Sequence, residues 1–158
     1  MSTSYEFTED DHSFMRLALE EAKRAYDRDE VPVGAVLVHA ETGEIIAQDG
    51  NRTRELSDPT AHAESLVIRS GCQKHSQQRV PYHNLYVTLE PCTMCAATIS
   101  FARINKVIFG ASDPKGGGII SGAKFYTQPT CHWRPEVHHG LMADECGQIL
   151  KDFFRSKR

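Results

Sequence analysis

The sequence lacks a long uninterrupted apolar run and an excess of basic residues, and both absences limit what the protein can do. No stretch approaches the roughly 20 consecutive apolar residues that a membrane-spanning helix needs, so we expect no membrane partner. The net charge is −3 over 158 residues, whereas proteins that bind nucleic acid over a large surface are typically basic. A local basic patch stays possible, because four of the residues 151–158 are basic.

The N-terminal residues also lack the basic start and apolar stretch of a secretory signal, so we expect a cytoplasmic protein. Five cysteines, an odd number, argue against a disulfide framework. With 158 residues, 40% hydrophobic and 25% charged, the chain can form one ordinary core, and we expect a single domain over residues 1–158.

Helical and strand patterns alternate along the chain. Apolar spacing and capping residues predict helices that begin near residues 8, 61, 92 and 142 and end near 28, 70, 103 and 154. β-branched and apolar runs predict strands at 33–38, 44–48, 85–89 and 106–110, and the Gly- and Pro-rich residues 113–135 predict a long loop. This order indicates an α/β or α+β sheet with helices on its faces.

Three side chains with metal-binding chemistry stand at two predicted helix starts. His62 opens one helix, and Cys92 and Cys95 follow Pro91 at the start of another. Zinc binds imidazole and thiolate well, and three protein ligands leave its fourth position open for water. A helix N-terminus favours the thiolate form of cysteine, so the sequence predicts a catalytic Zn²⁺ held by His62, Cys92 and Cys95.

A zinc-activated water needs a group that moves protons, and Glu64 is the expected general acid and base. Positions i and i+2 do not share a face within a regular helix. The pairing of His62 with Glu64 therefore works only if both residues lie at the mouth of the helix.

Two other interpretations use the same cysteines. A Cys-x-x-Cys pair alone is also typical of a thioredoxin-like redox site or of half a structural zinc site. The complete pattern His-x-Glu followed by Pro-Cys-x-x-Cys is far more specific, and it is the signature of zinc-dependent nucleobase deaminases. We expect Cys72, Cys131 and Cys146 to be buried or loop residues, with Cys131-His132 as a possible second metal contact.

Beyond the zinc motif, the sequence resembles the bacterial tRNA-specific adenosine deaminases of the cytidine deaminase superfamily. The resemblance runs over nearly the whole chain and rests on residues 30–38, 50–52, 59–64, 85–95 and 152–155. It implies a three-layer α/β/α fold with a five-stranded mixed sheet, a homodimer with one Zn²⁺ per subunit, and conversion of the wobble adenosine of tRNA to inosine. Here Asp113-Pro114-Lys115-Gly116-Gly117-Gly118 replaces the Lys-Thr-Gly-Ala-Ala-Gly loop of many members, a departure that concerns RNA contacts.

The resemblance also implies roles for individual residues. Asn51 would hydrogen-bond the flipped base, and Glu64 would move the protons. Asp113, Lys115 and the C-terminal helix would touch the tRNA anticodon loop. Aromatic and basic side chains are what RNA loops require, and the end of the chain offers Phe154, Lys157 and Arg158, while Arg52 and Arg54 lie close to Asn51.

Two rival functions share these residues. A deaminase of free nucleobases or nucleosides, of the cytosine or guanine type, would use the same zinc site. The features that separate it from a tRNA deaminase are the basic C-terminal residues 151–158 and the segment Asp113 to Lys115. A catalytically silent zinc-binding subunit would have no need of a proton shuttle, and the presence of Glu64 argues against it.

Overall fold

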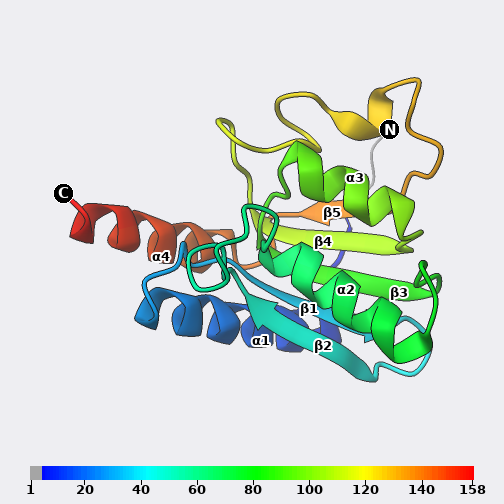
Figure 1. Cartoon of the computed structure of the whole chain (residues 1–158), viewed down its shortest axis with the longest axis horizontal. Coiled ribbons are helices and arrows are strands. Elements are labelled where there is room, and N and C mark those ends of the chain that lie inside the picture. Colours follow the sequence, from blue (N-terminus) through cyan, green and yellow to red (C-terminus); the bar gives the residue numbers. More distant parts are fainter. Residues whose placement is uncertain (1–4) are drawn as a thin grey trace.

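Five strands form one mixed sheet at the centre of the computed structural model, which describes residues 5–158 (Figure 1). In sequence order they are β1 (Gly34–His39), β2 (Ile45–Gly50), β3 (His83–Leu89), β4 (Lys106–Ala111) and β5 (Glu136–His139). Their order across the sheet is β2-β1-β3-β4-β5. β1 runs antiparallel to β2 and β3, whereas β3, β4 and β5 are mutually parallel.

Helices cover both faces of the sheet, as the three-layer prediction requires. They are α1 (Glu9–Asp27), α2 (Ala63–His75), α3 (Thr93–Phe101) and α4 (Ala143–Ser156), and a short 3₁₀ helix spans Phe125–Thr127. α2 and α3 pack on one face of the sheet, and α1 and α4 pack on the other. Figure 1 shows α4 extending past the edge of the sheet beside α1.

Strand β1 is apolar from Ala35 to Val38, and its surroundings explain why. Ala35 and Leu37 belong to the core beneath α2 and α3, while Val36 and Val38 belong to the core beneath α1. Successive side chains point to opposite faces, so a strand covered on both sides needs apolar residues at every position. Gly34 lets α1 approach closely, because a Cβ there would lie 1.9 Å from the Ala18 carbonyl oxygen.

The first helix begins with a capping box at Thr8, close to its predicted start. The Thr8 hydroxyl accepts from the Asp11 N–H at 3.0 Å, and the Asp11 carboxylate accepts from the Thr8 N–H at 2.9 Å. Reciprocal bonds of this kind satisfy two backbone donors that a helix N-terminus leaves free.

The element prediction was wrong in two places. Residues 113–135 are not all loop, since the 3₁₀ helix interrupts them. Strand β5 follows directly after them, whereas the pattern of residues had indicated only four strands. β5 has four residues with no inward-outward alternation, so local sequence gives no strand signal. The second helix continues to His75, past the predicted Ser70, until Ser76 adopts a left-handed conformation and ends it.

Within residues 5–158, no helix is long and apolar enough to cross a membrane.

Candidate metal centre and its pocket

His62 and Cys92 occupy equivalent positions in the fold, each as the N-cap residue of a helix. His62 precedes α2 and Cys92 precedes α3, and both have extended backbone angles. Neither side chain caps its own helix, so both are free for another partner. Cys95 lies in the first turn of α3 and is buried. The three predicted ligands therefore meet where two helices begin.

Their separations fit a tetrahedral zinc. The Nδ1 atom of His62 lies 3.6 Å from the Sγ atom of Cys92 and 3.5 Å from that of Cys95. With Zn–S near 2.3 Å and Zn–N near 2.0 Å, a tetrahedral ion would place nitrogen and sulfur about 3.5 Å apart. All three ligand atoms lie within 4.8 Å of one another, and no other such group occurs in the described part of the chain. The donor set and its spacing match zinc.

The electrostatics of the three ligands favour a thiolate in this place. A hydrogen bond with Cys95 lowers the pKa of Cys92, and the same interaction, together with burial, raises the pKa of Cys95. The hydrogen bond with Cys92 raises the pKa of His62. In the absence of a cation these groups share protons, and a divalent metal ion would displace them.

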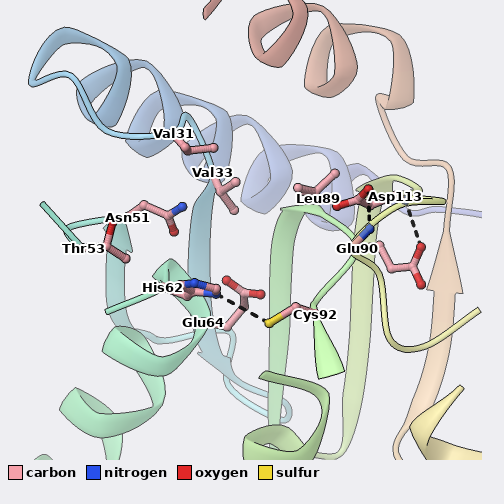
Figure 2. Close-up of a pocket in the computed structure, with 11 residues that line it drawn as sticks. Val31, Val33, Asn51, Thr53, His62, Glu64, Leu89, Glu90, Cys92 and Asp113 are labelled. Atoms are coloured by element: carbon pink, nitrogen blue, oxygen red, sulfur yellow. Dashed lines mark hydrogen bonds between the residues drawn. The ribbon is translucent and has the colours of Figure 1, made fainter. Parts of the chain in front are cut away.

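Glu64 lies in the first turn of α2 and is almost fully buried. Burial raises the pKa of its carboxyl to about 7, because a charged carboxylate loses its hydration there. Since His62 is the N-cap residue and not part of the regular helix, the two side chains can reach the same pocket, and Figure 2 shows them beside each other. A carboxyl with a pKa near 7 can both accept and donate a proton at neutral pH.

Asn51 follows β2 and lines the same pocket. Its Oδ1 atom accepts a hydrogen bond from the backbone N–H of Ala63 at 2.8 Å. The bond satisfies one free donor of α2 in place of the missing His62 cap, and it fixes the orientation of the amide. The Nδ2 group is thereby left as a donor.

The pocket has a volume of about 250 Å³. It is lined by Val31, Val33, Asn51, Thr53, His62, Glu64, Leu89, Glu90, Cys92, Asp113 and Gly116. His62 and Glu64 come from the start of α2, and the other residues come from segments next to the amino end of β1 and the carboxyl ends of β2, β3 and β4, which lie at the same end of the sheet. Pockets for drug-sized ligands run from about 300 Å³ upward, so this one suits a single small ring system.

The predicted substrate contacts divide into two groups. Asp113 lines the pocket, and its carboxylate accepts from the N–H groups of Lys115 and Gly116 at 3.2 and 3.0 Å. Lys115 is exposed. By contrast, Phe154, Lys157 and Arg158 lie at the far end of α4 and none of them lines the pocket.

The end of α4 presents an exposed aromatic ring among basic groups. Phe154 is half exposed, and with Lys151, Arg155 and Arg158 it borders a shallow cavity. Phe153 instead is buried and packs edge-to-face on Tyr26. Only one of the two adjacent phenylalanines is therefore available to a partner.

The other predicted cations are already paired. Arg52 lies 2.9 Å from the Asp49 carboxylate and 2.7 Å from that of Glu55. Arg54 contacts the Asp29 carboxylate at 2.6 Å, and Lys157 contacts the same carboxylate. Asp29 thus holds two cations from segments far apart in sequence.

The remaining cysteines lie apart from the candidate metal centre. Cys131 and Cys146 are buried and Cys72 is half-buried, as expected. The Cys131 thiol contacts the Ser100 hydroxyl and the Trp133 carbonyl, and His132 is exposed. Within residues 5–158, no group of three possible metal ligands includes Cys131 or His132, so nothing in this part of the chain supports the suggested second metal contact.

Sequence reasoning assigned no role to several residues of the pocket wall. Val31, Val33 and Leu89 supply its apolar surface, and Thr53 and Glu90 supply polar groups. Glu90 is buried, with hydrogen bonds to residues 113–121. Its place between a strand and the Pro-Cys motif was the only sequence signal, and it does not reveal those distant partners.

Known proteins share this fold and these motifs. Residues 8–111 match the cytidine and deoxycytidylate deaminase zinc-binding region. The tRNA-specific adenosine deaminase of Agrobacterium fabrum is 60% identical over 145 residues, covering 92% of this chain and 94% of that protein.

Two solved structures extend the comparison. One, from a study of A-to-I editing by tRNA deaminases at the wobble position, superposes with a TM-score of 0.85 and 59% identity, covering 87% of this chain and 99% of that one. A guanine deaminase from Bacillus subtilis gives a TM-score of 0.60 and 32% identity, over 67% of this chain and 66% of that one.

Proposed function

The chain belongs to the tRNA-specific adenosine deaminases, within the cytidine and deoxycytidylate deaminase family, and we propose that it hydrolyses the wobble adenosine of a tRNA to inosine. Water replaces the exocyclic amine, and ammonia leaves. The observation that carries the proposal is the convergence of His62, Cys92 and Cys95 with the buried Glu64 on a pocket of base size.

One zinc ion per subunit is proposed, held by His62, Cys92 and Cys95. When bound, zinc supplies a Lewis acid that activates water for attack near neutral pH. The metal-ligand spacing supports this assignment, because the nitrogen–sulfur separations of 3.5 and 3.6 Å are those of a tetrahedral site.

Glu64 is the proposed proton shuttle. Its carboxylate takes one proton from the attacking water and delivers it to the ring nitrogen. It then takes a second proton, from the hydroxyl that has added to the ring, and delivers that proton to the departing amine, which leaves as ammonia. Both the carboxylate and the carboxylic acid are needed in one turnover, and a glutamate side chain beside the zinc ligands can alternate between them.

Asn51 is the proposed base-recognition residue. Its oxygen is engaged by Ala63, so the Nδ2 group is the atom that faces a substrate acceptor. Val31, Val33 and Leu89 offer apolar surfaces to the ring faces. A base must leave its stack to enter this pocket, which favours a nucleotide in a flexible loop over one in a duplex.

The RNA would contact Asp113 at the pocket wall and Lys115, Phe154, Lys157 and Arg158 outside the pocket. Phe154 offers an exposed ring for stacking, and the neighbouring basic groups suit phosphates. We further propose a cytoplasmic homodimer. Support for a dimer comes from α3, where Phe101 is 73% exposed and Met94 is 38% exposed. The two lie seven residues apart and so on one face of the helix, and apolar side chains grouped on an exposed face mark interaction surfaces.

Guanine deamination is the second candidate. It is favoured by the resemblance to the B. subtilis guanine deaminase structure, and the pocket would admit a free purine as well as a flipped one. The basic end of α4 has no evident purpose in that reaction, so the tRNA substrate is preferred.

The deciding experiment offers the purified protein total tRNA, free adenosine, guanine and cytosine in parallel. We expect inosine at the wobble position of tRNA and little turnover of the free compounds. The Glu64→Gln variant is the matched control, because it keeps all three metal ligands. Turnover of guanine with no inosine in tRNA would contradict the proposal.

A further inference from the structure

Glu90 is a buried carboxylate that the zinc chemistry does not use. It lies between β3 and Pro91 and is 2% exposed. Within residues 5–158, no lysine, arginine or histidine forms an ion pair with it. Burying a charge is costly unless hydrogen bonds replace its hydration, so hydrogen-bond donors must stabilise the Glu90 carboxylate.

All five hydrogen bonds to the Glu90 carboxylate come from one loop, residues 113–121. One carboxylate oxygen accepts from the Asp113 N–H at 2.9 Å and from the Ser121 hydroxyl at 3.0 Å. The other accepts from three successive backbone N–H groups, those of Ile119, Ile120 and Ser121, at 3.1, 2.9 and 3.0 Å. The loop is thus folded around a single carboxylate.

The glycines of this loop match that arrangement. A Cβ at Gly117 would lie 2.3 Å from the Glu90 carboxyl carbon, and a Cβ at Gly118 would lie 2.5 Å from the Thr93 backbone nitrogen. The Gly118 N–H also donates to the Pro91 carbonyl at 2.9 Å. The Gly-rich sequence therefore allows the loop to close over Glu90 and over the start of α3.

The loop forms one wall of the pocket. Asp113 and Gly116 line it beside Glu90, across from Asn51 and Thr53, and Figure 2 shows the hydrogen bond that joins Glu90 to Asp113. We propose that Glu90 is a positioning residue, which holds residues 113–121 as a preformed wall for the substrate base. The substrate in this proposal rests on the deaminase function proposed above. The anchoring of residues 113–121 by Glu90 rests on geometry alone.

Glu30 provides a matched comparison. It is 1% exposed, and its carboxylate accepts from the N–H groups of Arg54 and Glu55 at 3.1 and 2.8 Å. It therefore anchors the segment that carries Thr53, on the opposite wall of the pocket. Loss of either carboxylate should loosen a different segment.

The first test is hydrogen exchange of the zinc-loaded protein without substrate. In Glu90→Gln, we expect faster exchange at the amides of residues 113–121 and unchanged exchange at residues 53–55. Glutamine keeps one acceptor oxygen, but its NH₂ group cannot accept from the donors that the other carboxylate oxygen binds. Glu30→Gln should give the reverse pattern. Unchanged protection of 113–121 in Glu90→Gln would overturn the proposal, and so would loss of zinc with the loop still protected.

The second test is kinetic and uses an anticodon stem-loop. A loop that is ordered only one-tenth of the time weakens apparent binding about ten-fold, so KM should rise by about that factor while kcat changes little. Gly117→Ala keeps Glu90 and displaces the loop, so it should give the same KM effect even if Glu90→Gln folds poorly. An unchanged KM in both variants would overturn the proposal.

The experiments distinguish an error in the proposed substrate from an error in the proposed role of Glu90. If the unmodified protein deaminates guanine and not tRNA, the function above is wrong. The exchange experiment needs no substrate and still decides whether Glu90 anchors the loop.

Discussion

Asn51 and Ala63 are joined by a hydrogen bond of 2.8 Å from the Ala63 backbone N–H to the Asn51 side-chain oxygen. The residue proposed to recognise the base therefore also caps the helix that presents His62 and Glu64. The proposed base recognition and the geometry of the candidate metal centre would thus depend on one amide, and substitutions at Asn51 have to separate the two.

Asn51→Ala should impair both stability and substrate binding. Loss of a helix cap costs about 0.5–2 kcal/mol, which lowers the thermal midpoint of a domain this size by a few degrees. kcat/KM should fall further, because the Nδ2 donor is lost as well. Thermal unfolding and steady-state kinetics on an anticodon stem-loop measure the two effects.

Asn51→Asp is the matched variant, since a carboxylate still accepts from Ala63 but offers no donor. We expect a thermal midpoint near that of the unmodified protein together with a reduced kcat/KM. Normal kcat/KM in Asn51→Asp would remove Asn51 from base recognition.

Glu64→Gln should retain zinc and lose turnover. The amide occupies the same space but cannot accept a proton from water, and general acid–base groups contribute about 10²–10⁴-fold in rate. We therefore expect kcat to fall by at least about 100-fold with unchanged zinc content. A variant with near-normal kcat would assign proton transfer to another residue.

The same pair of proteins tests the raised pKa of Glu64. In the metal-free chain, burial raises that pKa from 4.5 to about 7, so folding favours the protonated form. The contribution of Glu64 to stability is then fully present below pH 4.5 and is lost as the pH rises to about 7. Relative to Glu64→Gln, the free energy of unfolding should decline over this range and stay level above it, as measured by denaturant titration. A pH-independent difference would place the pKa near its ordinary value.

Much of this site was predictable because its chemistry is local. The candidate ligands His62, Cys92 and Cys95 follow from short motifs, and the helix starts that bring them together follow from capping and proline signals. Glu90 was not predictable, since its role depends on residues 23–31 positions away that fold back onto it. Strand β5 was not predicted for a similar reason. Its four residues form a strand only because they pair with β4.

Zinc content should depend on two cysteines and not on the others. Cys92→Ala and Cys95→Ala each remove a candidate ligand, so metal and activity should disappear together, whereas Cys72→Ala should keep both because that thiol lies outside the ligand group.

Zinc affinity should also weaken as pH falls, since the raised pKa of His62 makes a proton compete with the metal for the ring. Metal analysis and competition with a chelator measure these effects. Full activity in metal-free protein would contradict the hydrolytic mechanism.

The end of α4 separates RNA editing from deamination of free bases. Lys157 is exposed and pairs with Asp29, and Arg158 is exposed at the rim of the cavity beside Phe154. The double variant Lys157→Ala with Arg158→Ala removes two cations and leaves Phe154 in place. The thermal midpoint should barely move, because exposed ion pairs contribute little to stability. Affinity for an anticodon stem-loop should fall, and the slope of log K against log salt should become shallower by about 0.7 for each phosphate that the protein no longer neutralises.

Asp29→Asn is the control for this variant, because Asp29 holds both Lys157 and Arg54. It keeps Lys157 and Arg54 and removes the carboxylate that competes with phosphate for these two cations. If Lys157 binds RNA, Asp29→Asn should bind the stem-loop at least as tightly as the unmodified protein while the double variant binds it more weakly. If neither affinity nor salt slope changes in the double variant, the last turn of α4 is a solvated helix end. Deamination of free guanine then becomes the better explanation of the site.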